Sequence, residues 1–256
     1  MKLAAIEAMW HTEKAPAGMT LFGIPNEKTM QTDYEIKIPY LLGIIATRSL
    51  TEPMEGIAEL IEQGKKNIQE GILAYDALTR LQKNHQDEQA LAVFNEHGKY
   101  LGYGLLLKKY TEKVTDASDA QINQAAHDLM PKVKPLFFSF HIMVACGFFF
   151  IFLFGVGFYL SAKHKLHTSR WYHHLAFWSF PLPWIAAELG WIVAEYGRQP
   201  WAVQGILPTA MGVSSITAGQ VLTSLAGFVI FYSTLAVIEI YLMVKYIRLG
   251  PDGLSH

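Results

Sequence analysis

Three long apolar runs in the second half of the 256-residue chain constrain its fold more than any other feature of the sequence. They cover about 136–162, 174–196 and 218–244. Each has the ~20 mainly apolar residues that a helix needs to cross a ~30 Å hydrocarbon core. A core helix of a soluble protein keeps a polar stripe, and the first and third runs have none. We therefore predict an all-α membrane protein with three transmembrane helices.

Basic residues in the short loops set the predicted orientation of these helices. The segment 163–170 (KHKLHTSR) is basic, and Lys245 and Arg248 follow the third run, whereas the loop 197–217 carries a single charge. Positive charge in short loops marks the cytoplasmic side. We expect 163–170 and the C-terminus to lie in the cytoplasm, and the loop 197–217 to lie outside with residues 1–134.

Residues 1–134 are predicted to form a mostly helical extracytoplasmic loop domain, and 135–256 the transmembrane region with a short cytoplasmic tail. The first of these regions is longer than a simple connection needs to be, which favours a binding or lid role. A turn-rich stretch precedes a brief alternating strand at 34–38. Ser118 with Gln121 predicts a capping box for a last short helix. The expected helices cover about 53–63, 67–83, 87–109 and 119–129.

Composition excludes several classes of protein. A formal net charge of −1 gives no support to a nucleic-acid partner, which would need a basic face. The single cysteine, Cys146, lies inside an apolar run, so neither a disulfide framework nor a cysteine-based metal site is expected. The opening MKLAAIEAMWHTEK has no signal-peptide core before Glu7 interrupts it. Export of the outer region would therefore depend on something outside this chain.

Ionisable residues in the second apolar run are the strongest functional signal. Glu188, Trp191, Glu195 and Arg198 are spaced by three, four and three residues, which places them on one helical face. A carboxylate at the bilayer centre costs at least ~2.5 kcal/mol unless it is paired, hydrated or ligated. Glu195 and Arg198 lie near the outer end, where an interfacial anchor pair is the alternative to a site. Glu188 lies about 10 Å deeper, where a proton relay and a polar contact between helices both remain open.

Met143 in the first run is predicted to lie at a depth similar to that of Glu195. Methionine is a common packing residue, but a thioether is also a good axial ligand of a low-spin haem. His141, two residues earlier, could meet a haem propionate or water. Near the cytoplasmic face, anchoring is favoured over a metal site for a group of histidines: His164, His167, His173 and His174.

Three further features concern the helices and the chain just before them. Pro181 and Pro183 are expected to kink the second span, which neighbours or a cofactor can tolerate. Glu239 is another buried acid, in the third span. Pro131 and Pro135 are expected to break the chain before the membrane.

The motifs in this order resemble subunit I of the cytochrome bd quinol oxidases. WIVAEYGRQPW (191–201) resembles the GRQPW signature of that family, KLAAIEAMW resembles the start of its external quinol loop, and FHIMVACG resembles the helix after the loop. The resemblance covers essentially the whole chain. The length of the outer region resembles the long-loop branch of the family.

The resemblance implies roles for individual residues. Lys2 and Glu7 match the loop residues implicated in quinol oxidation. Met143 matches an axial ligand of haem b558, and Glu195 matches the ligand of haem b595, with Trp191 near the haems.

Arg198 matches the signature arginine that interacts with haem propionates, and His141 lies in the same haem environment. The family commonly has arginine at that position, so His141 is a departure from its pattern. Glu188 is a candidate for a proton path. The family passes electrons from quinol through haems b558, b595 and d, reduces O2 to water, and generates a proton-motive force.

The N-terminal half of the family's subunit I has no counterpart in this sequence. The subunit I of this family is about twice as long as this chain, and its earlier helices carry the histidine ligand of haem d and the histidine opposite Met143. The resemblance therefore implies a C-terminal half in a bacterial inner (plasma) membrane. Its partners would be the N-terminal half of subunit I, subunit II, small accessory subunits and membrane lipid. One alternative is a truncated, non-catalytic remnant without haem. The other is a proton-coupled transporter fragment using Glu188 and Glu239, but the sequence has no repeat symmetry to support it.

Overall fold

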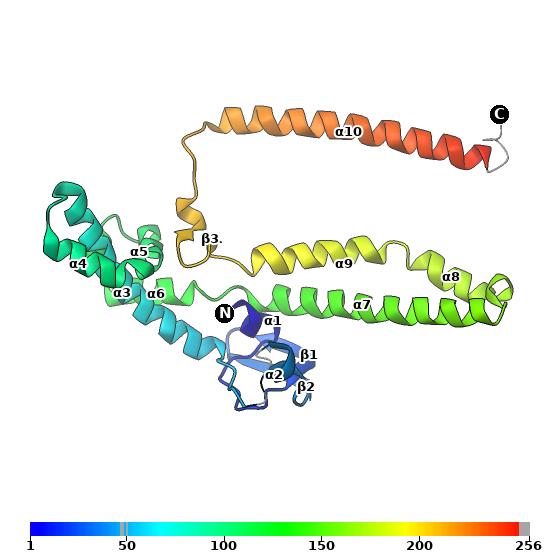
Figure 1. The fold of residues 1–256 in the computed structure, drawn as a ribbon, viewed down its shortest axis with the longest axis horizontal. Helices are drawn as coiled ribbons and strands as arrows, with labels where there is room; N and C mark the ends of the chain where they lie inside the picture. Colours follow the sequence, from blue (N-terminus) through cyan, green and yellow to red (C-terminus); the bar gives the residue numbers. More distant parts are fainter. Residues whose placement is uncertain (47–48, 50, 251–256) are drawn as a thin grey trace. The chain divides into compact units, whose positions relative to one another are not determined.

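A computed structural model describes residues 1–46, 49 and 51–250 of the chain (Figure 1). The chain forms two compact units, Met1–Gly212 and Val213–His256, which are described separately below. The described residues are mostly helical, as the sequence predicts. They also form two small antiparallel sheets, which an all-α description leaves out.

The first unit opens with a short helix and a β-hairpin. The strand predicted at 34–38 is confirmed, and it is part of a longer strand. This strand pairs with a second strand in the turn-rich stretch before it, where no strand was predicted. In that stretch Gly23 and Pro25 are residues of the first strand itself rather than of a turn. The elements here are α1 (Lys2–Ile6), β1 (Met19–Asn26), β2 (Gln31–Ile38) and α2 (Leu41–Ala46).

A group of helices follows, and its main difference from the prediction is a merger. The two helices expected at 53–63 and 67–83 form one helix of 27 residues, in which Gly64 is buried. The capping box of Ser118 and Gln121 is present, as predicted. The helices are α3 (Ile57–Lys83), α4 (Glu88–His97), α5 (Leu101–Leu105) and α6 (Asp119–His127), with 3-10 turns at Gly98–Tyr100, Leu106–Lys109 and Val114–Asp116.

The first apolar run is one continuous helix, α7 (Val133–Ala162), which starts three residues earlier than expected. Pro135 lies inside its first turn rather than before it. This is compatible with a helix because the N–H that proline lacks has no intrahelical partner there. The short loop after α7 contains a 3-10 turn at Leu166–Thr168.

The second apolar run is helical but interrupted. It consists of α8 (Arg170–Trp178), α9 (Leu182–Trp191) and a π-helical turn, η5 (Ile192–Tyr196). The break falls at 179–181, where a kink was predicted from Pro181, and the hydroxyl of Ser179 donates a hydrogen bond to the carbonyl of Ala176 at 2.8 Å. Because of this break, only α7 and the helix of the second unit are each long and apolar enough to cross a membrane among the described residues.

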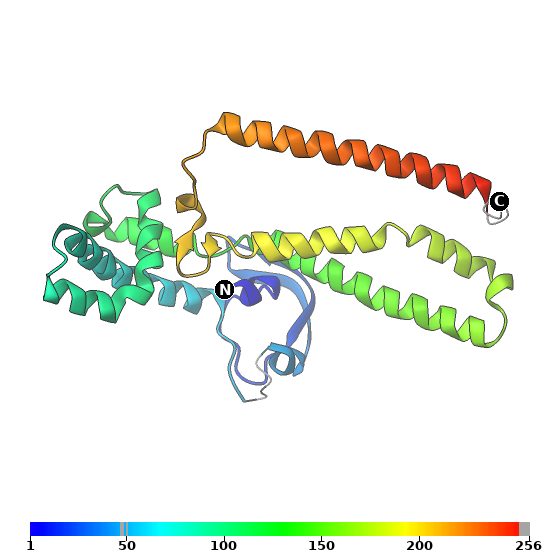
Figure 2. The same ribbon diagram turned by 45° about the horizontal axis from the view of Figure 1, so that its top comes forward.

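Helix α9 and η5 run back along α7 and pack against it (Figures 1 and 2). A small hairpin of β3 (Trp201–Val203) and β4 (Leu207–Pro208) follows, and then a 3-10 turn at Thr209–Met211. The indole of Trp201 is buried in the core of the helical group, with its ring 5.0 Å from that of Tyr103 in an edge-on arrangement. The signature segment is therefore anchored in the outer region of the chain.

The second unit is dominated by a single helix, α10 (Ala218–Leu249). Thr217 and Gln220 form a capping box at its N-terminus, and an 18-residue window within it has a mean hydropathy of 2.1. Its start agrees with the predicted third span, and it continues five residues beyond the predicted end at 244. Arg248 in the last turn suits the negative end of the helix dipole.

Candidate functional site

The contact between α7 and α9 places a methionine sulfur against a glycine. A Cβ atom built on Gly190 would lie 3.3 Å from Sδ of Met143. That separation is shorter than the usual 3.5–4.0 Å between non-bonded carbon atoms, so a side chain at position 190 would press on the thioether. The absence of a side chain at Gly190 therefore lets Met143 lie close to the α9 backbone, one residue before Trp191.

Glu195 lies on the π-helical turn η5, a detail that the helical spacing did not predict. Single π-helical turns inside α-helices occur frequently at functional sites. The Arg198 guanidinium lies 2.6 Å from the Glu195 carboxylate, and both side chains are about half exposed (45% and 50%). Glu188 and Trp191 are exposed as well. The four residues of the predicted stripe therefore leave their side chains accessible along α9 and η5.

Lys2 reaches the same end of the second run. Its ammonium donates a hydrogen bond to the carbonyl of Ala194 at 3.3 Å. Its aliphatic carbons lie so close to Gly197 that a Cβ there would be 3.1 Å from them. The last carbonyls of a helix have no intrahelical partners, and a lysine side chain can satisfy one of them. The start of the outer region is thus fixed to the segment that carries Glu195.

A cavity of about 400 Å³ opens beside this contact. Two cations, Lys2 and Arg198, contribute to its wall, together with the aromatic rings of Tyr103 and Trp201. Such a set of donors suits a carboxylate group better than a cation or an apolar ligand. The carboxamides that complete the polar part of the wall are Gln63, Asn67, Gln199 and Gln204.

Glu7 lies elsewhere, at the C-terminal end of α1, and is almost completely buried at 2% exposure. The backbone N–H of Thr20 donates a hydrogen bond to its carboxylate at 3.0 Å. Burial raises the pKa of the Glu7 carboxyl above its ordinary value, more than this hydrogen bond lowers it. A carboxyl with a raised pKa binds a proton more readily than an ordinary carboxyl does.

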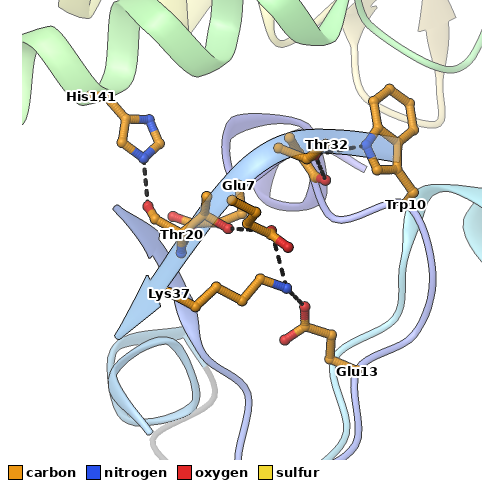
Figure 3. A network of polar contacts seen from close by, with 9 residues as sticks. Glu7, Trp10, Glu13, Thr20, Thr32, Lys37 and His141 are labelled. Atoms are coloured by element: carbon orange, nitrogen blue, oxygen red, sulfur yellow. Dashed lines mark hydrogen bonds and ion pairs between the residues drawn. The ribbon is translucent and has the colours of Figure 1, made fainter. Parts of the chain in front are cut away.

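His141 faces this part of the chain (Figure 3). Its Nε2 lies 2.6 Å from the carbonyl oxygen of Thr20, and its Nδ1 lies 2.8 Å from the carbonyl oxygen of Phe137. The imidazole also stacks on the Phe137 ring at 4.0 Å. Both ring nitrogens therefore lie against backbone carbonyls, and a neutral imidazole can donate to only one of them. The predicted contact of His141 with a haem propionate stays a prediction.

An ion-pair network on the hairpin borders Glu7, and no pattern in the sequence predicted it. Lys37 on β2 pairs with Glu13 and, at 3.2 Å, with Glu35 (Figure 3). Burial lowers the pKa of Lys37, but its hydrogen bonds and ion pairs with the two carboxylates outweigh that effect and raise it. The hydroxyl of Thr20 donates to Glu35 at 3.2 Å, so the network continues to the residue that contacts Glu7.

The donor atoms near the outer end of the helix pair fit haem groups. Met143 offers a thioether and Glu195 a carboxylate, on two neighbouring segments, and Arg198 and Lys2 stand beside a cavity that suits carboxylates such as haem propionates. Each donor can fill one axial position. By contrast, the described residues contain no group of three His, Cys, Asp or Glu side chains that could hold a metal ion. The histidines near the loop 163–170 are among the residues to which this applies.

The fold and these donors fit one class of protein, a helical membrane protein with a candidate haem site where α7 packs against α9 and η5. The chain belongs to the cytochrome bd terminal oxidase subunit I family, whose profile matches residues 1–251.

Two relatives show the extent of this similarity. The chain is 38% identical over 255 residues to cytochrome bd-II ubiquinol oxidase subunit 1 of Escherichia coli (strain K12), covering 100% of this chain and 50% of the relative. It is 29% identical over 257 residues to cytochrome bd ubiquinol oxidase subunit 1 of Bacillus subtilis (strain 168), covering 100% of this chain and 43% of the relative. The chain thus spans half or less of the length of these relatives.

Proposed function

We propose that this chain is the C-terminal part of a quinol:O2 oxidoreductase of the cytochrome bd type in a bacterial plasma membrane. Two observations carry the proposal in a chain of this family: Met143 on α7 lies against Gly190 of α9, and Glu195 on η5, the segment that follows α9, pairs with Arg198. Both relatives are named as ubiquinol oxidase subunits. Here that activity requires the N-terminal half of subunit I and subunit II, with small accessory subunits as further partners.

The proposed topology has three spans. Residues 1–134 form the outer, quinol-binding loop of the long-loop type, and 135–256 form the membrane region with a cytoplasmic C-terminus. The middle span consists of α8, α9 and η5. Its break is compatible with the proposal if the missing N-terminal half covers it, because irregular backbone at membrane depth is tolerated where it is buried in protein or lines a cavity.

Glu7 and Lys2 act on quinol in this proposal. A quinol loses two protons when it is oxidised, so the site needs a group that accepts a proton. Glu7 fits this role because its carboxyl is buried and has a raised pKa. Lys2 supplies positive charge at the other end of α1, next to η5, where it favours a negatively charged oxygen.

Met143 holds haem b558 and Glu195 holds haem b595 in the proposal, and haem d is shared with the N-terminal half. When bound, these groups supply one-electron transfer and the reduction of O2. Arg198 and His141 bind propionates or order their surroundings, and Trp191 packs near the haems. Glu188, exposed on α9, belongs to a path that brings protons to the oxygen-reducing site.

The proposal is tested by producing the chain with and without the N-terminal half of subunit I, together with subunit II. Reduced-minus-oxidised spectra are expected to show haem bands only in the combined sample, and quinol-driven O2 consumption only there. Met143→Leu is expected to remove the low-spin b558 band selectively, and Glu195→Gln the b595 band. His85→Leu, an exposed site in the turn after α3, is the matched control. Absence of haem from the combined sample would refute the proposal.

A further inference from the structure

The free edge of strand β1 lies along α7. The strand pairs with β2 on one side only, so the backbone groups on its other edge need different partners. Thr20 lies on this strand with 1% of its surface exposed. Water cannot satisfy its N–H and C=O, so the contacts of these two groups decide how the strand is held.

Two side chains far apart in sequence take up the backbone polar groups of Thr20. Its N–H donates to the Glu7 carboxylate at 3.0 Å, and its C=O lies 2.6 Å from Nε2 of His141 (Figure 3). A carbonyl oxygen only accepts, so the imidazole is the donor in the second contact. Thr20 therefore connects the carboxyl of Glu7 to a side chain on α7.

We infer that His141 is a positioning residue for quinol oxidation, which acts on Glu7 through the backbone of Thr20. The inference rests on the proposed function, in which Glu7 accepts a quinol proton. By fixing the Thr20 carbonyl, His141 holds the strand whose N–H orients the Glu7 carboxylate. A connection of this kind assigns His141 to the quinol-oxidising side of the protein, in addition to the haem environment expected from the sequence.

The orientation of the imidazole supports this role. The ring stacks on Phe137 and meets Phe140 edge-on. These contacts fix the ring so that Nε2 faces β1. Arginine also offers several N–H donors, so His141→Arg keeps the chemistry that the contact needs.

Loss of the imidazole has a specific expected consequence. His141→Leu leaves the buried Thr20 carbonyl without its donor, and the β1 edge loosens. Glu7 then keeps its chemistry but loses its fixed position. Because a misplaced catalytic group lowers the rate of the chemical step more than substrate binding, kcat for quinol is expected to fall roughly tenfold with KM nearly unchanged.

The experiment compares His141→Leu, His141→Arg and the control His85→Leu in the complex with the N-terminal half and subunit II. Three quantities are measured: amide hydrogen exchange of the β1 segment around Thr20, quinol-driven turnover, and turnover with a small one-electron donor that reduces the haems directly. The low-spin haem spectrum is recorded in parallel, because Met143 is only two residues away.

The inference expects faster exchange in β1 and lower quinol kcat for His141→Leu, unchanged dye-driven turnover and haem spectrum, and recovery of kcat in His141→Arg. Unchanged exchange overturns it, and so does faster exchange with unchanged quinol kcat. An equal loss of both turnovers with an altered haem band would show that His141 acts on the haem instead. A failure of the proposed function is distinguishable, since the unaltered complex would then lack quinol turnover.

Discussion

The contact between Met143 and Gly190 gives the most direct test of the proposed haem ligation. Gly190→Ala adds one methyl group 3.3 Å from the sulfur, so the sulfur or the helix must move by a few tenths of an ångström. Overpacking of this kind costs about 1–3 kcal/mol, and the flexible methionine side chain favours the lower end. Alanine is also more favourable than glycine in a helix by about 0.5–1 kcal/mol. The two effects nearly cancel in stability.

They do not cancel at the haem, because only the displacement acts on the Met143 ligand. A thioether ligand raises the potential of a low-spin haem, so weakening it disfavours the reduced form. If the reduced form loses about 1 kcal/mol, the midpoint potential falls by roughly 40 mV, since 1.4 kcal/mol corresponds to about 59 mV for one electron. The sulfur thus reports a small steric change as a shift in potential.

The assay is a potentiometric titration of the low-spin band in the assembled complex. Gly227→Ala on α10 is the matched control, because a Cβ there meets nothing within 4 Å in the described part of the chain. The expected result is a lower midpoint potential for Gly190→Ala and an unchanged one for Gly227→Ala. A midpoint potential of Gly190→Ala equal to that of the unaltered protein, with haem bound, would refute either the contact or the ligand assignment.

Three further predictions follow from the outer region. Burial raises the folded-state pKa of Glu7, so the stability that its protonated form contributes is lost as pH rises above about its ordinary pKa of 4.5. The charges of Glu13, Lys37 and His141 also act on this pKa. Glu7→Gln should flatten the thermal-unfolding profile against pH and abolish most quinol turnover; an unchanged profile contradicts the burial argument. Trp201→Ala should destabilise the packing of the signature hairpin by about 3–5 kcal/mol, seen as faster proteolysis of 201–212, and equal rates would contradict it. Burial raises the pKa of Asp128, but its hydrogen bonds with Lys109 and Tyr110 outweigh this effect and lower it. The stability that Asp128 contributes is therefore lost as pH falls below about 3.8. Asp128→Asn should remove this acid-dependent loss, measured by amide exchange in α6.

The apolar runs were the most predictable part of the chain. Continuous hydropathy without a polar stripe gave α7 and α10 to within a few residues, because their length and composition depend on no tertiary contact. The second run shows the limit of that reasoning. Its hydropathy hides the break at 179–181, which only the prolines indicated, and the π-helical turn that contains Glu195 depends on how the backbone packs.

Strand β1 shows a different limit. Its residues include Gly23 and Pro25, which usually mark turns, so local propensity indicated a loop. Pairing with β2 and the contacts of its free edge with Glu7 and His141 stabilise the strand instead. Those partners are separated from β1 by up to 121 positions, which no local pattern can reveal.

Candidate site residues were identified by type and spacing, but their grouping was not. The sequence placed Lys2 with Glu7, whereas the structure places the Lys2 ammonium at the Ala194 carbonyl and buries Glu7 at the other end of α1. Gly190 was not recognised as a site residue. Small residues where membrane helices approach closely are a known signal, and it could have been found that way.

Three contacts join the long outer region to the segments that carry the proposed ligands. His141 connects β1 to α7, Lys2 connects α1 to η5, and Trp201 anchors the hairpin after η5 in the helical group. Residues 1–134 therefore share one compact unit with α7 and α9, although composition alone separates them. A displacement of this region on quinol binding would move the backbone next to Met143 and Glu195 together. Residues 1–134 thus form a frame for the segments that carry Met143 and Glu195, which explains why a region of this length is folded.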